Sequence, residues 1–259
     1  MKNRRLPALL AATGATALLL SSCTSTVGEN QSASGVPLIK KDTLTVCSNT
    51  PYAPFEFERD GEVVGFDMAL ADEIAKDLDV EKDVIQTGFE GIESGADLST
   101  NKCDVAISGI TITDARKSVM TFSDPYFDDE LGLLVPADSD IQSFDDLAEA
   151  RVAVQQATTG QIYAEDHNLD FEQQEDVELM LQKLESGGVD AVIGNVSVVG
   201  NRVKENPDLQ LVDQQSNGEQ LGVAVNSDNS AMVDSVNSTI TRISGDGTLD
   251  DMREEWMGL

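Results

Sequence analysis

The sequence predicts an α/β fold built as two lobes, and three observations support this prediction. Short apolar runs that are typical of buried strands alternate with amphipathic helical patterns. The alternation occurs twice, once before and once after Pro136. Roughly 220 residues follow the N-terminal region, which is enough for two lobes of ordinary size. Because strands that are joined through helices pair in parallel, we expect each lobe to hold a mostly parallel sheet flanked by helices.

The N-terminal segment, residues 1–22, is predicted to be a signal peptide. Lys2, Arg4 and Arg5 precede an apolar run at residues 6–20, which is too short to cross a bilayer as a helix. A charged start before an apolar centre is typical of a secretory signal, which is removed from the mature protein. We therefore expect an exported protein.

Cys23 follows Leu20-Ser21-Ser22, and this pattern resembles a lipobox. Cys23 would then be the lipidated first residue of the mature protein and would anchor it to the outer face of the cytoplasmic membrane. Plain signal cleavage near Ser22 is the alternative. Residues 23–40 are rich in Ser, Thr, Gly and Asn, so they predict a flexible tether.

The charge balance excludes one large class of partners. The chain carries 17 Lys and Arg against 47 Asp and Glu, a formal net charge of −30. Lys2, Arg4 and Arg5 would leave with the signal, so that 14 basic residues remain against 47 acidic ones, or −33. Such a surface repels phosphates, which excludes nucleic acid as a partner and disfavours binding flat on anionic lipid.

The first lobe is expected to contain three strands and two helices, in the order strand 44–48, helix starting at the N-cap Asp67, strand 84–87, helix 91–101 and strand 105–108. Leu70, Ile74 and Leu78 recur every four residues and give the first helix one apolar face. The second helix has a weaker pattern, with Ile92 and Leu98 as its apolar anchors.

The second lobe repeats the alternation. Its expected elements are strand 152–155, helix 160–165, extended segment 171–173, helix 177–184 ended by Gly187-Gly188, strand 191–193 and a returning segment at 221–225. Two final helices are expected at residues 229–244 and 249–256.

Cys47 and Cys103 remain as a pair if Cys23 is lipidated. In an exported chain a leftover pair favours a disulfide bond. Two buried free thiols are the alternative, because sequence alone does not give the Cα spacing that a bridge requires.

The segment after the strand at 105–108 is the first candidate for a site. Thr113 is placed as the N-cap of a helix at 114–120, and Arg116 falls in its first turn. Unpaired N–H groups at such a turn suit an anion, and a guanidinium can bind a carboxylate through two parallel hydrogen bonds. Thr111 adds a hydroxyl donor. The prediction is a site for a small carboxylate, and the alternative is an ordinary strand-to-helix turn with a solvated arginine.

Other candidate residues also follow strand ends. Ligands bind beyond the carboxyl ends of the strands in open parallel sheets. Tyr52, Phe89 and the segment 109–116 each come after a predicted strand, so we expect them to converge.

Several ordered motifs resemble the bacterial extracellular solute-binding proteins of family 3, the substrate-binding proteins of polar amino-acid ABC transporters. The resemblance covers almost the whole mature chain. Its motifs are Thr111-Ile112-Thr113-x-x-Arg116, Phe122-Ser123-Asp124-Pro125-Tyr126, Thr50 to Phe57, Gly65-Phe66-Asp67, Gln155 to Gly160, Val189-Asp190-Ala191-Val192, and Asp246-Gly247-Thr248-Leu249 with Trp256.

This resemblance implies a two-lobed, type II periplasmic-binding-protein-like fold with two hinge crossings. Lobe 1 would be discontinuous, at residues 41–134 and 226–259, and lobe 2 would span residues 135–225. The crossings would lie near 133–136 and 223–226, and the ligand would be trapped between the lobes.

The resemblance also implies how a ligand carboxylate is held. Arg116 would bind it, helped by Thr111 and by Thr159 from the second lobe. A simple helix cap is the alternative for Thr159. Gly109 would let the backbone approach the ligand closely, with its carbonyl accepting from an ammonium, unless it is a plain turn glycine.

Further residues would surround the rest of the ligand. Tyr52 and Phe89 resemble the aromatic walls of the family, although either could belong to the core. Asn49 lies near the same mouth, whereas Glu56 is expected to be structural. Asn195 stands where the family usually has an aspartate that pairs with the ligand ammonium, so a formal charge is missing there.

The implied function is the capture of a small polar amino acid or a related carboxylate for an ABC permease and its ATPase, by a monomer without cofactor or metal. We expect no enzyme activity, because His167 is the only histidine and neither a nucleophile–base set nor a metal-spaced cluster is evident. A lyase or dehydratase of small carboxylic acids, or a ligand sensor that docks on a receptor, is the alternative.

Overall fold

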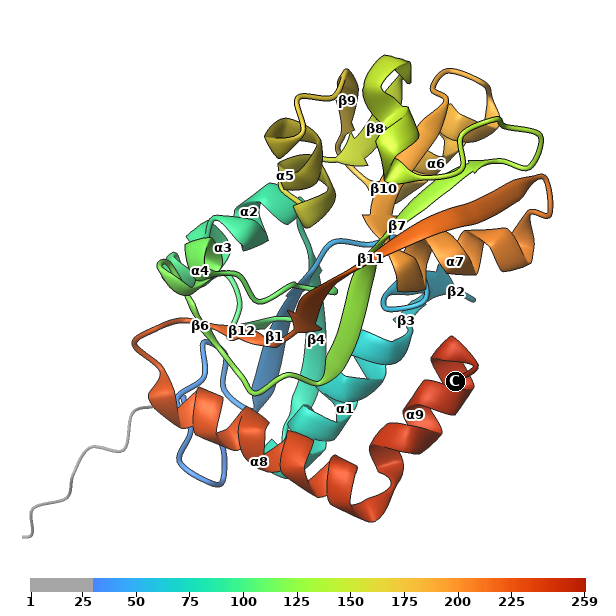
Figure 1. The fold of residues 1–259 in the computed structure, drawn as a ribbon. Coiled ribbons are helices and arrows are strands. Elements are labelled where there is room, and N and C mark those ends of the chain that lie inside the picture. Colours follow the sequence, from blue (N-terminus) through green and yellow to red (C-terminus); the bar gives the residue numbers. More distant parts are fainter. Residues whose placement is uncertain (1–29) are drawn as a thin grey trace, which may run out of the picture.

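A computed structural model describes residues 30–259, apart from the side chain of Asn217. The expected signal peptide, the lipid attachment at Cys23 and the first part of the tether therefore lie outside the described residues. The described chain forms two five-stranded sheets, each with helices packed against it (Figure 1). From residue 30 onward, no helix combines the length and the apolar character that a membrane span requires.

The first sheet has the strand order β4-β1-β5-β12-β6. Parallel pairing joins β1 to β4 and β5, and only β12 runs against the other strands. Its strands are β1 (Thr43–Ser48), β4 (Glu81–Gln86), β5 (Val105–Ala106), β6 (Thr121–Phe122) and β12 (Ala224–Val225). A separate hairpin consists of β2 (Phe57–Arg59) and β3 (Glu62–Val64).

The helices of this lobe are α1 (Phe66–Leu78), α2 (Phe89–Glu93), α3 (Ala96–Ser99), α4 (Asp114–Lys117), α8 (Ser230–Asp246) and α9 (Thr248–Met257). Leu70, Ile74 and Leu78 of α1 are buried, as the apolar face predicted. Two predictions were wrong in detail. The N-cap of α1 is Gly65, not Asp67, and Gly95 divides the expected helix 91–101 in two because its positive φ of 72° interrupts the helical path.

The second sheet has the order β11-β7-β10-β8-β9. Here β8 pairs in parallel with β9 and β10, whereas β7 runs against both of its neighbours. The elements of this lobe are β7 (Phe127–Pro136), a 3-10 helix (Phe144–Glu149), β8 (Val152–Gln155), α5 (Thr159–Asp166), β9 (Phe171–Gln174), α6 (Val177–Glu185), β10 (Ala191–Asn195), α7 (Val196–Glu205) and β11 (Leu209–Leu221). In both sheets four of the five strands share one direction, which confirms the predicted architecture.

Two long strands connect the lobes. β7 and β11 form an antiparallel pair that extends from Phe127 opposite Leu221 to Pro136 opposite Leu209 (Figure 1). Residues 133–136, near which we expected the first crossing, pair with β10 and β11 inside the second sheet. The exact bounds of the two lobes stay a prediction.

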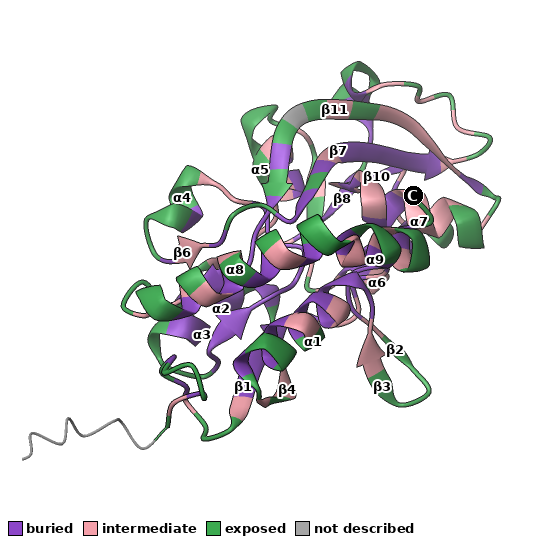
Figure 2. Ribbon diagram, turned by 90° about the horizontal axis from the view of Figure 1, so that it is seen from below, coloured by how far each residue is buried: buried purple, intermediate pink, exposed green. Residues whose placement is uncertain are grey.

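Burial follows the layers of the fold. In Figure 2 the strands β1 and β7 are buried over most of their length, whereas the outer helices α8 and α9 carry exposed faces. The prediction of a flexible tether was wrong for residues 30–40. Val36 is 5% exposed and Leu38 is 7% exposed, and both belong to the core. The amide of Ile39 donates to Asp104 at 2.7 Å, so this segment packs on the first lobe.

The predicted disulfide bond is present. Cys47 of β1 and Cys103, just before β5, are bonded, and their Cα atoms lie 5.6 Å apart. Because β1 and β5 are neighbours in the sheet, the bond joins two segments that pairing already holds together.

Candidate ligand-binding site

A narrow cavity lies between the two lobes. It is lined by Asn49, Tyr52, Phe89, Ser108, Gly109, Thr111, Arg116, Gln155, Thr158, Thr159 and Asn195. All of the predicted ligand-binding residues are in this set. Ser108, Gln155 and Thr158 were not predicted. The convergence expected from the strand ends is therefore confirmed, while contact of these residues with a ligand stays a prediction.

Arg116 is the charged group of the cavity and is only 2% exposed. Its Nη1 donates to the carbonyl of Thr111 at 2.8 Å, and its Nη2 donates to the carbonyl of Ala157 at 2.9 Å. The guanidinium carbon lies 5.2 Å from the centre of the Phe89 ring. Burial lowers its pKa, which the more distant charges of Glu93 and Glu219 oppose.

The partners of Arg116 leave its charge uncompensated by a direct ion pair. Among residues 30–259 no carboxylate forms a salt bridge with it, and the two hydrogen bonds use only two of its five N–H groups. A buried cation is costly unless an opposite charge pairs with it. The site is therefore suited to a carboxylate brought by a ligand.

The turn that carries Arg116 begins where β5 ends. Thr113 is the N-cap of α4, and its hydroxyl accepts from the amide of Arg116 at 3.2 Å, as predicted. The helix ends at Lys117, three residues before the predicted end at Met120. Ser118 follows with helical dihedrals but does not extend the helix.

Gly109 makes the sharpest part of this turn, with φ of +53°. A Cβ atom there would lie 2.7 Å from Cε1 of Tyr52, so the aromatic ring can approach only because the residue is glycine. The Gly109 amide donates to Oδ2 of Asp67 at 2.7 Å, and the Tyr126 hydroxyl donates to Oδ1 at 2.8 Å. Asp67 thus holds the turn in place, and burial raises its pKa to about 6.

Glu56 lies behind the same turn and is fully buried. One of its oxygens accepts from the hydroxyl of Ser108. Burial and the charge of Asp67 raise its pKa well above the usual value. This agrees with the structural role expected for Glu56, because it supports Ser108 from the core side and does not line the cavity.

The second lobe presents a helix start to the cavity. Thr158 is the N-cap of α5: its hydroxyl accepts from the amide of Gln161 and donates to the carbonyl of Gln155 at 2.7 Å. Thr159 is the first residue of the helix, so the capping role that was the alternative for Thr159 belongs to Thr158. The positive end of α5 faces the same cavity as Arg116, and both favour an anion there.

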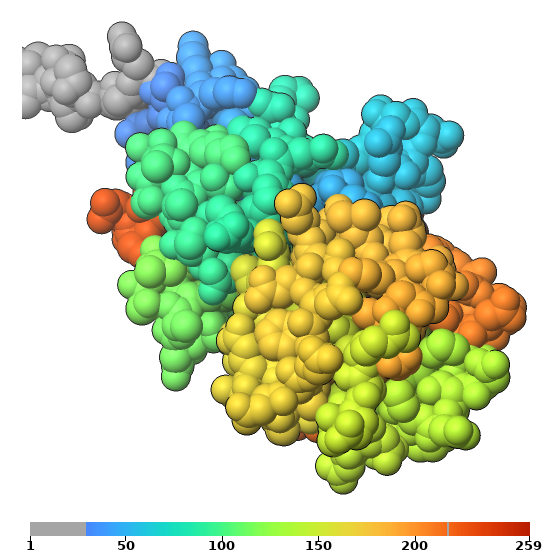
Figure 3. All heavy atoms as spheres, turned by 90° about the horizontal axis from the view of Figure 1, so that it is seen from above, coloured from blue at the N-terminus to red at the C-terminus, as the bar shows by residue number. Residues whose placement is uncertain are grey.

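The two lobes also contact each other directly across the cavity. Gln155 Nε2 donates to Asn49 Oδ1 at 2.8 Å, and the Tyr52 hydroxyl donates to Asn195 Oδ1 at 2.7 Å. In Figure 3 the atoms of the first lobe around residues 75–100 meet those of the second lobe around residues 160–190 without a gap on this face. The cleft is thus closed over the cavity.

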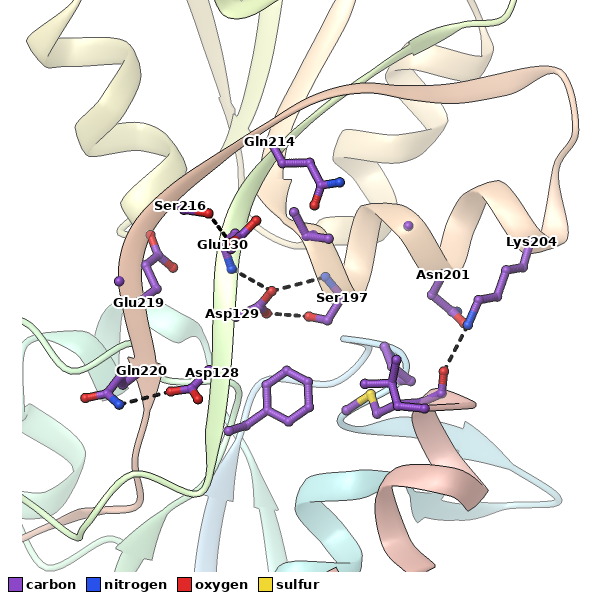
Figure 4. Close-up of a pocket in the computed structure, with 17 residues that line it drawn as sticks. Asp128, Asp129, Glu130, Ser197, Asn201, Lys204, Gln214, Ser216, Glu219 and Gln220 are labelled. Atoms are coloured by element: carbon purple, nitrogen blue, oxygen red, sulfur yellow. Dashed lines mark hydrogen bonds between the residues drawn. The ribbon is translucent and has the colours of Figure 1, made fainter. Parts of the chain in front are cut away.

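Two further pockets adjoin this region. One is narrow, shares Tyr52, Gln155, Thr158 and Asn195 with the cavity, and is otherwise apolar. A larger one, of about 580 Å³, lies between β7, β11, α7 and the C-terminus (Figure 4). None of the predicted ligand-binding residues lines the larger pocket, so we call it the hinge-side pocket and assign the ligand site to the smaller cavity. No group of three His, Cys, Asp or Glu suited to a metal ion occurs in the described part of the chain.

Comparison with known proteins decides the family. Residues 44–259 match the bacterial extracellular solute-binding proteins, family 3. The chain belongs to this family. It is accordingly a solute-binding protein and not an enzyme, which sets aside the lyase alternative. Membership in an extracellular family also supports the predicted export.

Relatives agree over most of their length. The chain is 30% identical to "ABC transporter arginine-binding protein 1" of Escherichia coli, covering 79% of this chain and 86% of the relative. It is 31% identical to a "Probable histidine-binding protein" of Neisseria gonorrhoeae, covering 93% of this chain and 92% of the relative.

Solved structures confirm the two-lobed fold. A mutant of ArgBP from T. maritima superposes with a TM-score of 0.80 at 35% identity, covering 84% of this chain and 96% of that one. An ancestral arginine-binding protein bound to arginine gives a TM-score of 0.79 at 35% identity, covering 83% and 98%.

Proposed function

We propose that this solute-binding protein captures a small polar amino acid, or a related small carboxylate, and delivers it to an ABC import permease driven by an ATPase. The observation that carries the proposal is the buried guanidinium of Arg116, which has no carboxylate partner among residues 30–259 and lines a cavity between the lobes. The names of the relatives support the substrate class, because they specify arginine, histidine, cystine and glutamine.

The ligand carboxylate binds Arg116 and the start of α5, assisted by Thr159. Thr111 lines the same wall of the cavity, and its hydroxyl donates to Glu219. Tyr52 and Phe89 flank the rest of the ligand, and Gly109, Asn49 and Asn195 also line the cavity. Because these residues come from both lobes, the ligand gains contacts in the closed arrangement that an open one lacks, so binding and closure are coupled.

The finer parts of the proposal concern the setting of the protein. Cys23 carries a lipid that holds the mature protein on the outer face of the cytoplasmic membrane. The protein works as a monomer.

A thermal-shift screen tests the proposed function. The mature protein is heated with each of the twenty amino acids, their betaines and simple organic acids. A ligand at about 100 times its Kd stabilises the folded state by about 2.7 kcal/mol, which raises the melting temperature by several degrees. We expect such a rise for at least one amino acid, and no rise in the Arg116→Ala variant. Failure of every amino acid and carboxylate to raise the melting temperature of the wild type contradicts the proposal.

A further inference from the structure

Glu219 lies between the ligand cavity and the hinge-side pocket. It projects from β11, one of the two strands that connect the lobes, and is only 6% exposed. Figure 4 shows it on the hinge side, near Asp129 and Glu130 of β7. Its Oε2 accepts from the hydroxyl of Thr111 and from Nδ2 of Asn195, each at 3.1 Å. Both donors line the ligand cavity.

This contact fixes the orientation of the Asn195 amide. An ionised carboxylate only accepts hydrogen bonds, so the nitrogen of Asn195 must face Glu219 and the oxygen must face the other way. On that other side the Tyr52 hydroxyl donates to Oδ1 at 2.7 Å. Glu219 therefore makes Asn195 present an acceptor at the wall of the cavity.

Glu219 also brings a negative charge to this wall. Burial lowers the pKa of Arg116, and the charge of Glu219 opposes this effect. Burial raises the pKa of the Tyr52 hydroxyl, and the charges of Asp129, Glu56 and Glu219 raise it further. Glu219 contributes to the raised pKa of Asp129, about 6, which burial mainly causes. The cavity thus has a positive charge at Arg116 on one side. On the side of Asn195 the neutral amide is backed by the negative charge of Glu219.

We propose that Glu219 is a specificity-determining residue that makes the cavity select carboxylates carrying a protonated amine close to the carboxylate. Arg116 binds the carboxylate, Oδ1 of Asn195 accepts from the amine, and Glu219 orients and polarises that amide and supplies the charge that balances the amine. The proposal rests on the proposed function and deepens it. It also explains why residue 195 is an asparagine and not an aspartate, because an aspartate there would place two carboxylates about 3 Å apart.

The first experiment separates the amine from the rest of the ligand. Calorimetry measures the Kd values of L-arginine and 5-guanidinopentanoate, which lacks the α-amine, and of L-glutamine and glutaramate, which form a similar pair. The amino acid with the largest shift in the thermal screen and its deaminated analogue form a third pair. The proteins are the wild type, Glu219→Gln and the control Glu130→Gln. Glu130 is a neighbouring carboxylate that lines the hinge-side pocket and not the cavity.

We expect Glu219→Gln to weaken amino-acid binding about tenfold or more and binding of the deaminated analogues less than about threefold, because the amine is the ligand group that the lost charge attracts. Glu130→Gln should change every Kd less than about threefold. Equal losses for both members of a pair, or no loss at all, overturn the role of Glu219. If the wild type binds none of the compounds, the proposed function is contradicted, and the proposed selectivity is contradicted with it.

A second experiment moves the negative charge from residue 219 to residue 195, its partner in the hydrogen bond. In the double variant Glu219→Gln with Asn195→Asp, the amide of residue 219 can donate to the new carboxylate. We expect amino-acid binding to recover to within about threefold of the wild type. Without ligand, Asn195→Asp alone should lower the melting temperature at pH 7 more than at pH 5, because two adjacent carboxylates repel each other until one is protonated. A pH-independent melting temperature difference, or no recovery in the double variant, contradicts the proposed pairing.

Discussion

Gly109 is the residue at which backbone, carboxylate and aromatic ring meet. Gly109→Ala would force a side chain into a positive φ of 53° and set its Cβ 2.7 Å from the buried ring of Tyr52. We expect the free energy of unfolding to fall by about 1–3 kcal/mol, measured by urea denaturation. Gly200→Ala is the matched control, since Gly200 lies in α7 and a Cβ there meets nothing within 4 Å. Equal unfolding midpoints for Gly109→Ala and the wild type would refute the predicted strain.

At this scale the sequence located the residues that lie in local motifs. Thr111 and Arg116 belong to one short segment, and the family resemblance supplied the more distant members of the cavity. The sequence did not identify Asp67 as the acceptor for the Gly109 amide, because the two residues are 42 positions apart. Glu219 was also missed, since its contact with Thr111 spans 108 residues and no local pattern marks it.

The elements show the same division between local and distant information. The strand at Val152–Gln155 was predicted with its observed bounds because it is a short apolar run between polar segments. β7 and β11 were not predicted as a long pair. In β7 three acidic residues follow Phe127. β11 is mostly polar and has register shifts after Leu211 and Gln215 that break the alternation of a regular strand.

The disulfide bond gives a test at the scale of elements. It closes a segment of 56 residues that includes α1 and β4. Replacing both cysteines, Cys47→Ala with Cys103→Ala, should lower the free energy of unfolding by on the order of 4 kcal/mol, because the unfolded chain regains the entropy of an open loop. Denaturant titration measures the loss, and thiol titration of the denatured mature protein, with Cys23 lipidated and without reductant, should find no free thiol. An unchanged unfolding midpoint would contradict this account.

The whole molecule is expected to become more stable as the pH falls from 7.5 to about 5. Burial raises the pKa of both Asp67 and Asp129 to about 6 from 3.8, so the folded protein binds these protons more tightly than the unfolded chain. Stability is therefore lost as the pH rises through this interval. We expect a gain on the order of 2 kcal/mol on acidification, measured by thermal unfolding.

The gain should reverse at lower pH. Ion pairs lower the pKa values of Glu73 and Asp190, and the stability that they contribute is lost as the pH falls through their folded-state values. Asp129→Asn should flatten the rise between pH 7.5 and 5, because one of the two protons is then absent. A melting temperature that falls steadily from pH 7.5 to pH 5 would show that these carboxylates are ionised in the folded protein.

The central claim is that Arg116, in the cavity between the two lobes, binds the carboxylate of an amino acid. Calorimetric titration of the wild type and Arg116→Ala tests it most directly, with the amino acid that gives the largest thermal shift. The account predicts affinity weaker by at least about 2 kcal/mol, or roughly 30-fold, because a charged carboxylate loses its partner in a desolvated site. Near-wild-type affinity in a folded Arg116→Ala variant would contradict it.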